Sequence, residues 1–403
     1  MISDFITFLR DKILIPVLLG LMLSIVVCGC GKEEPVFPNE AEPAPSESMK
    51  NILCISDLDF YCVSSHCISL TWADDYDDSV AYYEIYRSAV RKNGEAKGWE
   101  LLEKLYSDDI VNGERNLWTD KLDSASAVQY LYKIVPVVKD GTEYTDGDGH
   151  AILASNVLVC LDPGHFKNYS PVQGENSYGY DEGTYMLQLG LRLRDVLRKE
   201  AGIDVLMTRE TDSITISGYS DGLLDSAYIN LRGEYAAGAD LFLSLHTNAN
   251  LDYANGAETF GQPVEICKPI LLINAVGKNS ELCLNIANAI GENLAATNYE
   301  CGLAGTSKFD TANKNTILTW SDAYNDSVDQ AGTVCFRAGQ NAPDFYGVLR
   351  GASEVHVPGL IIEHGFHTVP EVRNQLVNGD LLARWAKADA KGIAQGFGFN
   401  LID

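Results

Sequence analysis

The stretch Asn156-Val157-Leu158-Val159-Cys160-Leu161-Asp162-Pro163-Gly164-His165 decides the fold, because an apolar run of strand length ends there in a turn and a histidine. Two later stretches, residues 240–246 and 358–363, repeat this arrangement and end in a histidine and a glutamate. Short runs rich in leucine and β-branched residues, separated by segments with helical periodicity, predict an α/β sheet buried on both faces. Ligands and catalytic groups collect at the carboxyl ends of such strands. We therefore expect three side chains to meet in a metal-dependent hydrolase site: His165, His246 and Glu363.

The amino-terminal segment has the pattern of an export signal. Arg10 and Lys12 precede an uninterrupted apolar stretch from Ile13 to Cys28, which leads to Cys30. This pattern predicts a lipoprotein signal peptide over residues 1–29, with Cys30 as the acylated residue. The alternative is a plain membrane anchor, but sixteen residues would span only about 24 Å of a hydrocarbon core about 30 Å thick. Both interpretations place the rest of the chain outside the cytoplasm, in the cell envelope.

After the acylated Cys30, the chain through residue 50 is expected to be a disordered linker. Residues 31–50 contain four prolines and five glutamates and almost no apolar side chains. Such a segment cannot bury enough surface to fold. At about 3 Å per residue it would hold the folded part up to roughly 60 Å from the membrane.

The chain is strongly acidic, with a formal net charge of −26. A surface of this charge repels phosphate backbones, which excludes nucleic acid as an expected partner. Solubility of an exported protein explains the charge at least as well as any choice of partner does. Eight cysteines follow Cys30, and outside the cytoplasm they can form disulfides whose pairing the sequence does not define. Cys62 and Cys67 are close enough along the chain to pair locally.

Residues 51–152 are predicted to form an all-β domain. Apolar and polar residues alternate over residues 68–72, 82–88 and 129–137, and turns recur between these runs. The segment resembles a fibronectin type III domain, with Trp72 in the place of the early core tryptophan and Tyr130 or Tyr132 in that of the late core tyrosine. We expect a spacer here rather than a binding module, since no catalytic constellation is visible.

Residues 156–403 are expected to carry the function. Glu182 opens a strongly amphipathic helix after the His165 loop. A carboxylate at a helix start is favourable through the helix dipole alone, so a capping role for Glu182 is the simple alternative. The order of the surrounding motifs argues for more than a cap. They are Asp162 to His165, Glu182, Thr208-Arg209, Arg232, Ser244 to Ala249 and Glu363 to Phe366.

This order resembles the zinc-dependent N-acetylmuramoyl-L-alanine amidases of the Amidase_3 family through most of residues 156–398. The resemblance implies an α/β domain with a mixed, mainly parallel sheet, in which His165, Glu182 and His246 bind Zn²⁺ and Glu363 is the catalytic acid/base. Two imidazoles and one carboxylate leave a tetrahedral zinc with an open position, as in catalytic sites. Asn248, Arg209 and Arg232 are expected to bind substrate or support the site, with the two arginines bracing loops.

The chain also departs from the family pattern. The loop after His165 begins Phe166-Lys167-Asn168-Tyr169 instead of a short glycine-rich segment, and it contains Glu175, an alternative to Glu182 as ligand. Residues 298–345 look long for a connection between a helix and a strand, which suggests a wall or lid beside the site or an inert insertion. His364 is expected on the strand face opposite Glu363 and is not a predicted ligand.

The sequence therefore predicts a lipid-anchored extracytoplasmic zinc amidase that cleaves the amide between the lactyl group of peptidoglycan and the L-alanine of its stem peptide. Two alternatives are a non-catalytic or autoinhibited wall-binding lipoprotein and a zinc peptidase that acts elsewhere on the stem peptide. Peptidoglycan and the membrane are the expected partners, and the sequence identifies no activating protein.

Overall fold

The computed structural model of the chain describes most residues after position 54. The described ranges are 55–73, 80–106, 115–138, 151–167, 180–249 without 215 and 217, 268–303, 314–320, and 333–402 without 368. The predicted signal peptide, Cys30 and the linker lie outside them, as does Glu175. Residues 52–403 form one compact unit. In the described part, no helix has both the length and the apolar character needed to cross a membrane.

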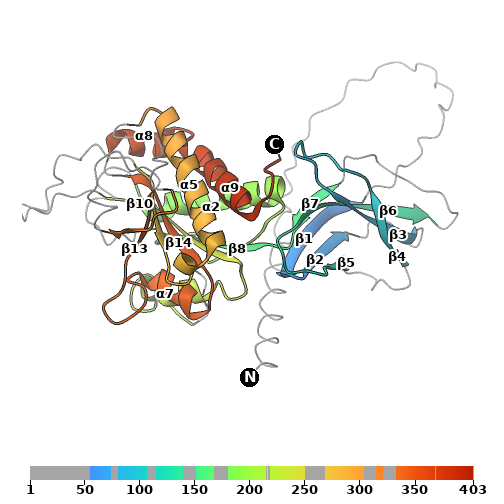
Figure 1. The fold of residues 1–403 in the computed structure, drawn as a ribbon, viewed down its shortest axis with the longest axis horizontal. Coiled ribbons are helices and arrows are strands. Elements are labelled where there is room, and N and C mark those ends of the chain that lie inside the picture. Colours follow the sequence, from blue (N-terminus) through green and yellow to red (C-terminus); the bar gives the residue numbers. More distant parts are fainter. Residues whose placement is uncertain are drawn as a thin grey trace, which may run out of the picture. The chain divides into compact units, whose positions relative to one another are not determined.

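The first part of this unit consists of two antiparallel sheets that share one core (Figure 1). One sheet has the strand order β1-β2-β5 and the other β4-β3-β6-β7. The strands are β1 (Ser56–Ser64), β2 (Cys67–Ala73), β3 (Val80–Ala89), β4 (Glu100–Tyr106), β5 (Asn116–Lys121), β6 (Gln129–Val138) and β7 (Ile152–Ser155). The predicted all-β region is therefore a β sandwich.

The core of the sandwich contains the aromatic residues that the sequence places there. Trp72 of β2 is fully buried and meets Tyr83 of the opposite sheet edge to face, with ring centroids 5.3 Å apart. Of the two candidates for the late core tyrosine, Tyr132 is fully buried and Tyr130 is half-buried. The assignment to the fibronectin type III class stays a prediction.

The two cysteines of the sandwich that lie among the described residues, Cys62 and Cys67, are not bridged. The six cysteines among the described residues, Cys62 and Cys67 included, are free thiols. The expected local pairing of Cys62 with Cys67 is therefore wrong. The register explains why, since Cys67 lies opposite Ser64 rather than opposite Cys62.

The second part is an α/β domain built on a seven-stranded sheet of order β12-β13-β11-β14-β10-β8-β9. Its strands are β8 (Leu158–Pro163), β9 (Asp204–Met207), β10 (Leu241–Asn248), β11 (Ile270–Ile273), β12 (Leu318–Thr319), β13 (Thr333–Phe336) and β14 (Gly359–Phe366). Strands β9, β8, β10 and β14 are parallel to one another, and β11 joins β14 in the antiparallel sense. The mixed, mainly parallel sheet is as predicted.

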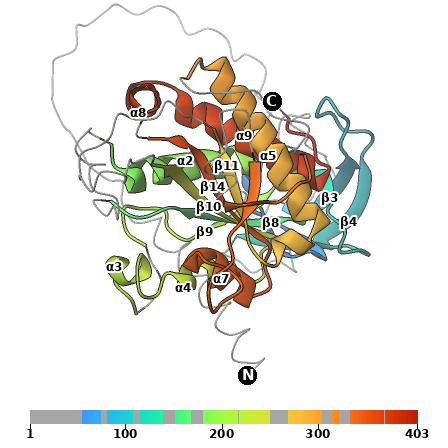
Figure 2. The same ribbon diagram turned by 60° about the vertical axis from the view of Figure 1, so that its left-hand side comes forward.

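Helices cover both faces of this sheet, which explains why its strands read as continuous apolar runs. Figure 2 shows α2, α5 and α9 on one face and α4 and α7 on the other. The helical segments are α2 (Glu182–Val196), η4 (Leu197–Ala201), α3 (Asp221–Leu224), α4 (Asn230–Glu234), η6 (Gly277–Asn279), α5 (Glu281–Glu300), α7 (Gly347–Glu354), α8 (Pro370–Asn378) and α9 (Leu381–Phe397).

The segment at residues 298–345 is less irregular than expected. Helix α5 extends to Glu300, and β12 and β13 form the far edge of the sheet within this segment. These elements account for part of the segment, while residues 304–313 and 321–332 lie outside the described residues, so the expected wall, lid or insertion stays a prediction. A strand of four residues, β13, and one of two, β12, are too short for a pattern of alternation to identify them.

Side chains join the sandwich to the α/β domain. Arg198 of η4 bonds to Asp59 of β1 at 2.6 Å and also to Asp204 at the start of β9. The other carboxylate oxygen of Asp204 accepts a hydrogen bond from the backbone N–H of Cys62 at 2.9 Å. Gln129 of β6 donates to the backbone carbonyls of Ala201 and Asn400. Only residues 156 and 157 separate β7 from β8, so the two sheets follow each other directly.

Candidate metal centre

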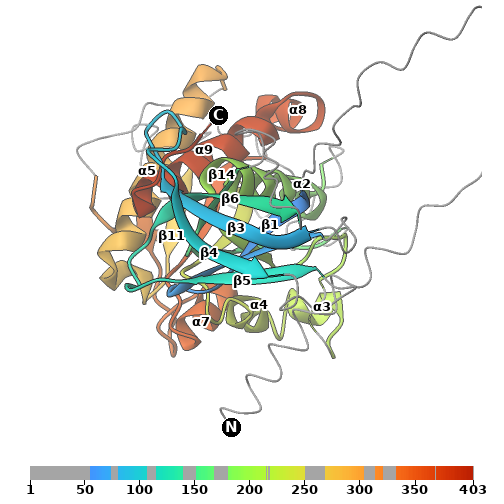
Figure 3. The ribbon, with the colours of Figure 1, turned by 90° about the vertical axis from the view of Figure 1, so that its right-hand side faces the viewer.

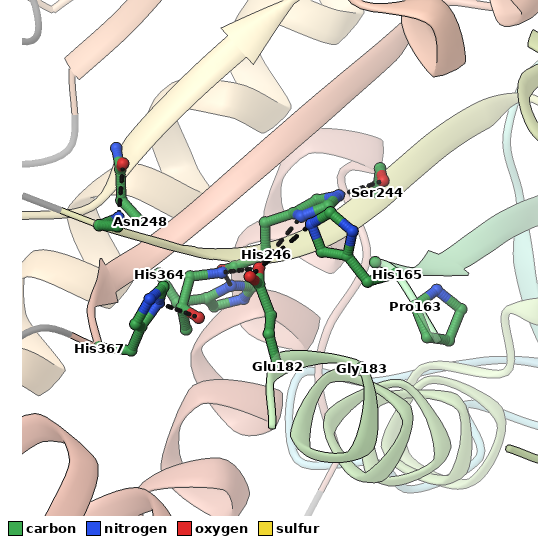
Figure 4. Close-up of polar contacts among 12 residues, drawn as sticks. Pro163, His165, Glu182, Gly183, Ser244, His246, Asn248, His364 and His367 are labelled. Carbon is green, nitrogen blue, oxygen red and sulfur yellow. Dashed lines mark hydrogen bonds and ion pairs between the residues drawn. The ribbon is translucent and has the colours of Figure 1, made fainter. Parts of the chain in front are cut away.

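Three side chains that the sequence places far apart converge at the carboxyl ends of β8 and β10 (Figure 4). His165, Glu182 and His246 each offer one ligand atom, and these atoms lie within 4.8 Å of one another. Glu182 Oε1 is 3.1 Å from His246 Nδ1, and Glu182 Oε2 is 3.7 Å from His165 Nε2. This is the set of candidate ligands predicted from the sequence.

Glu182 reaches the site from the first turn of α2. Asp181 caps that helix, since its carboxylate accepts a hydrogen bond from the backbone N–H of Thr184 at 3.2 Å. Glu182 is free for another contact, and its Oε1 accepts a hydrogen bond from the backbone N–H of Thr247 at 2.9 Å. The residue is 3% exposed. A carboxylate buried this deeply requires compensating charge or hydrogen bonds, which a cap at the surface does not.

The two histidines are oriented by hydrogen bonds on the ring nitrogens that face away from Glu182. His165 Nδ1 is 3.0 Å from Asp225 Oδ2, and His246 Nε2 is 3.1 Å from Ser244 Oγ. Partners of this kind fix the orientation of metal-binding imidazoles. Sequence reasoning missed Asp225, because nothing in the pattern around it distinguishes it from a surface acid. His165 also has φ +52°, a left-handed conformation that non-glycine residues rarely adopt and that is characteristic of functional sites.

Glycine is required beside two of the candidate ligands. A Cβ atom at Gly164 would lie 2.4 Å from His246 Cε1 and 2.5 Å from the carbonyl oxygen of Leu245. A Cβ atom at Gly183 would lie 2.4 Å from the backbone of Phe166. These close approaches explain why the turn before His165 needs a glycine at position 164 and the first turn of α2 needs one at position 183.

Arg232 joins the turn at the end of β8 to Asp225. We call the three residues Asp162, Asp225 and Arg232 the buried charge cluster. Its guanidinium contacts both carboxylate oxygens of Asp162, at 3.0 and 2.9 Å, and Asp225 Oδ1 at 2.6 Å. Burial opposes the charge of Asp162, but Arg232 outweighs it and holds the pKa of this carboxyl below its usual range. Asp225 of this cluster fixes the orientation of the His165 ring, so Arg232 supports the site through Asp225 and not by direct contact with a candidate ligand.

Arg209, the second predicted supporting arginine, connects loops. It is 2% exposed, and its guanidinium donates to the carbonyl oxygens of Gly183 at 2.6 Å, Pro163 at 3.2 Å and Gly164 at 3.3 Å. These bonds tie the start of α2 to the turn that precedes His165. The expected role as a brace thus rests on hydrogen bonds to carbonyl groups.

Glu363 lies on β14 directly opposite His246 of β10 in the parallel register. Its Oε2 atom is buried and has no hydrogen-bond partner within the described residues. Burial and the nearby charge of Glu182 raise the pKa of Glu363 to about 8, against the opposing effect of His165. A carboxyl group with a pKa near neutrality can both accept and return a proton. His246 and Glu363 lie within β10 and β14, each followed by further strand residues, whereas the sequence had placed them where the strands end.

His364 points to the other face of β14, as the alternation predicts. Its Nδ1 lies 3.0 Å from the carbonyl oxygen of His246, and its Nε2 lies 2.8 Å from Asp389 Oδ2 on α9. The register between β10 and β14 shifts just beyond His246 and Glu363. The His364 imidazole thus forms a hydrogen bond with the His246 carbonyl at the point where the pairing of β10 with β14 becomes irregular. Sequence reasoning did not find Asp389, which reads as one polar residue in an amphipathic helix.

A second group of hydrogen bonds lies beside Glu182. Tyr180 Oη is 2.6 Å from Thr247 Oγ1, which in turn is 3.0 Å from His367 Nδ1. The Tyr180 ring stacks on His367 with centroids 5.2 Å apart. Asn248, a predicted substrate or support residue, follows on β10, and its Oδ1 accepts a hydrogen bond from the backbone N–H of Ala249. Its buried Nδ2 has no partner in the described part of the chain.

The chemistry of the three side chains fits a divalent transition metal. Burial lowers the pKa of His246, which keeps this imidazole neutral at pH 7 as a ligand must be. Burial also acts to lower the pKa of His165, but Glu182 and Asp225 outweigh it and raise this pKa to about 9, so a metal would displace a proton from this ring on binding. Burial opposes the charge of Glu182, but the two histidines hold the pKa of its carboxyl well below the usual range. Two imidazoles and one carboxylate are a donor set that zinc accepts, with a fourth position open.

Comparison with known protein families gives one match. Residues 159–395 match the Amidase_3 family, described as N-acetylmuramoyl-L-alanine amidase. No curated protein matches the sequence.

Several solved structures are similar, with low identity. N-acetylmuramoyl-L-alanine amidase AmiC2 of Nostoc punctiforme is 20% identical, with 60% of this chain and 97% of that chain covered and a TM-score of 0.38. The CwlD amidase from Clostridioides difficile, solved in complex with the GerS lipoprotein, is 16% identical, with 60% and 99% covered and a TM-score of 0.40. Ami1 from Mycobacterium smegmatis is 15% identical, with 60% and 97% covered and a TM-score of 0.38.

Proposed function

Because the chain belongs to the N-acetylmuramoyl-L-alanine amidase family through residues 159–395, we propose that it is a zinc-dependent enzyme that cleaves the amide between the lactyl group of peptidoglycan and the L-alanine of the stem peptide. The observation that carries this proposal is the convergence of His165, Glu182 and His246, with Glu363 opposite His246. The first three would hold the metal and Glu363 would move the proton.

Each residue has a distinct part in the proposed reaction. Zinc, when bound, would supply Lewis acidity that polarises the scissile carbonyl and makes water nucleophilic at neutral pH. Glu363 accepts the proton of the attacking water on the carboxylate oxygen that lacks a partner among the described residues. Glu363 then returns this proton to the departing amine nitrogen of L-alanine, which becomes a good leaving group only when protonated. Asp225 and Ser244 hold the two imidazoles in place during the cycle.

The proposed location is the cell envelope, with a lipid anchor at Cys30. The apolar stretch from Ile13 to Cys28 and the basic residues before it support this location. The acidic chain has no expected affinity for anionic lipid, so acylation rather than charge would hold it at the membrane. Metabolic labelling with a radioactive fatty acid tests this directly, and Cys30→Ser should abolish the label.

The decisive test of the activity is product analysis. A soluble version of the chain that begins at Met49 is incubated with purified peptidoglycan, with and without a chelator, and the products are identified by mass spectrometry. Stem peptides with a free L-alanine amino terminus are expected, absent under chelation and restored by zinc. Products that keep the muramoyl–alanine bond would indicate a zinc peptidase. Intact muropeptides in every sample would indicate a wall-binding protein without this chemistry.

A further inference from the structure

The β sandwich contains a cavity of about 680 Å³ that lies away from the metal centre. The strands β4 and β5 border it, and each is the outermost strand of its own sheet (Figure 3). Its volume falls in the range of small-molecule sites, which is about 300 to 1,000 Å³. None of the residues that line it belongs to the stretch that matches the amidase family. The cavity therefore has no part in the proposed reaction.

The cavity has a polar lining where a sandwich normally closes with apolar side chains. Trp118 of β5 donates from Nε1 to Glu103 Oε2 of β4 at 2.7 Å, so this bond connects the two sheets. Arg87 of β3 makes a second connection, since its Nη1 donates to Asp120 Oδ2 of β5 at 2.7 Å. Asp120 is 6% exposed. Charges are costly to bury, and a domain that only filled space would gain more from apolar contacts here.

Two aromatic rings face this polar lining. Trp118 and Tyr130 are both half-buried and both line the cavity. The guanidinium of Arg87 lies 4.8 Å from the centroid of the Tyr130 ring and holds that ring in place. Bonds to Asp120 and Glu103 likewise hold Arg87 and Trp118. The site thus offers flat apolar surfaces next to fixed hydrogen-bond donors and acceptors, with little side-chain freedom left to lose on binding.

The charge of the lining selects the class of ligand. Three carboxylates, Glu103, Asp120 and Asp123, outnumber two cations, Arg87 and Lys121, in a chain of net charge −26. Such a site repels anionic ligands. An uncharged ligand with hydroxyl and amide groups on apolar rings matches both the aromatic faces and the carboxylate and guanidinium groups. Sugars have this combination of properties.

We propose that the β sandwich is a carbohydrate-binding module, in which the cavity between β4 and β5 holds an uncharged N-acetylhexosamine segment of a glycan strand. The choice of this sugar rests on the proposed wall function, whereas the existence of a sugar site rests on the cavity alone. A glycan strand held there would stay tethered to the chain while its stem peptides are cut, which raises their effective concentration. The sandwich would then be a binding module and not the spacer expected from the sequence.

The test measures binding without turnover. The full-length chain carrying Glu363→Gln is titrated with the tetrasaccharide of N-acetylglucosamine by isothermal calorimetry. Saturable binding is expected, and Trp118→Ala should weaken it at least tenfold. Trp99→Ala is the matched control, because Trp99 lies on the same domain outside the lining and contacts Lys133. It should leave the dissociation constant unchanged.

A second variant guards against misfolding, because Trp118 also packs on the core of the sandwich. Glu103→Gln removes only an exposed carboxylate and should weaken binding severalfold with unchanged thermal unfolding. No saturable binding, or binding that neither Trp118→Ala nor Glu103→Gln weakens, overturns the proposal. Binding of a free stem peptide in place of the saccharide overturns it as well. Saccharide binding through Trp118, together with no release of stem peptides by the parent chain that keeps Glu363, would refute the proposed amidase and leave the sugar site standing.

Discussion

His364 Nε2 lies 2.8 Å from Asp389 Oδ2, and both side chains are fully buried. A carbonyl oxygen only accepts hydrogen bonds, so His364 Nδ1 must donate to the carbonyl of His246, 3.0 Å away. The pair connects α9 to the strand residue that carries a candidate ligand. Burial raises the pKa of Asp389, against the effect of His364. Mutations of this pair can separate its effect on the position of His246 from its effect on the stability of the fold.

His364→Leu should lower the free energy of unfolding by about 3–5 kcal/mol, because Asp389 is left buried without its partner. The rate of amide cleavage should fall at least tenfold, since the His246 carbonyl loses its donor. The double variant His364→Leu with Asp389→Leu removes the unpaired carboxylate and should regain most of the stability but not the rate. Urea denaturation and initial rates measure the two effects. A double variant that regains both would mean that the pair has only a structural role.

Glu363→Gln should keep the metal and lose turnover by a factor of about 10² to 10⁴, the range for general acid–base catalysis. Glutamine has the same shape but cannot accept the proton. His246→Ala, in contrast, removes a ligand and should lose both metal and activity. Zinc content by atomic emission and release of stem peptides distinguish the two variants. Full activity in Glu363→Gln would show that another residue is the acid/base.

Gly164→Ala should reduce zinc affinity, because the new Cβ would lie 2.4 Å from His246 Cε1 and push that ring away from Glu182. Gly222→Ala is the control, since a Cβ at Gly222 meets no atom within 4 Å. The control should be neutral or slightly stabilising, as alanine is favoured over glycine within a helix. Competition with a chromogenic chelator measures the affinities, and equal values for both variants would contradict the close packing of the turn.

The raised pKa of Glu363 predicts that the free energy of unfolding of the metal-free protein falls as the pH rises. Its pKa of about 8 in the folded state lies above the usual value of 4.5, so folding favours the protonated form. The associated stability is fully present below pH 4.5 and is lost as the pH rises through 8. Glu363→Gln removes this loss. Under chelation, the variant should gain stability over the parent chain between pH 5 and pH 8, by roughly a few kcal/mol. A constant difference across this range would refute the shift.

Arg198→Met should destabilise the whole unit of residues 52–403 by about 3–5 kcal/mol, because Asp204 is buried and loses its charge partner. Arg194→Met is the matched control one turn earlier, since Arg194 pairs with the exposed Asp195 and Glu210. Exposed pairs contribute at most about 1 kcal/mol. Guanidinium denaturation compares the two. Similar effects in both variants would mean that the sandwich is not held through Arg198.

The strand-end pattern alone brought His165 and His246 to one site, because both follow short apolar runs. Glu182 was expected as the third ligand through the resemblance to the Amidase_3 family, since its local sequence is also that of a helix start. The parallel part of the sheet and the opening of α2 at Glu182 followed from the same signals. The short strands β12 and β13 could not be predicted, because edge pairing depends on partners distant in the chain.

Residues that act through other residues were also missed. Asp225 is a single acid in the turn after α3 and Asp389 a single acid within α9, and only the folded chain brings them to His165 and His364. Nothing in the sequence indicated the contacts of Arg198 with Asp59 and Phe60. A contact between two domains does not change the hydrophobic periodicity of either one. Local patterns identified the groups proposed for chemistry and not the groups that hold them.

The short passage from β7 into β8 has a mechanical consequence. Strand β7 belongs to the sandwich, and two buried residues, Asn156 and Val157, lead from it into β8, which ends at the turn that carries His165. A pull applied at the amino-terminal end of β1 would load the bonds of Arg198 to Asp59 and Phe60 as well as this passage. Tension would thus be transmitted to the metal centre directly, because no long flexible segment lies between the sandwich and β8. Single-molecule stretching from residue 55 should therefore show one large rupture that coincides with loss of the site.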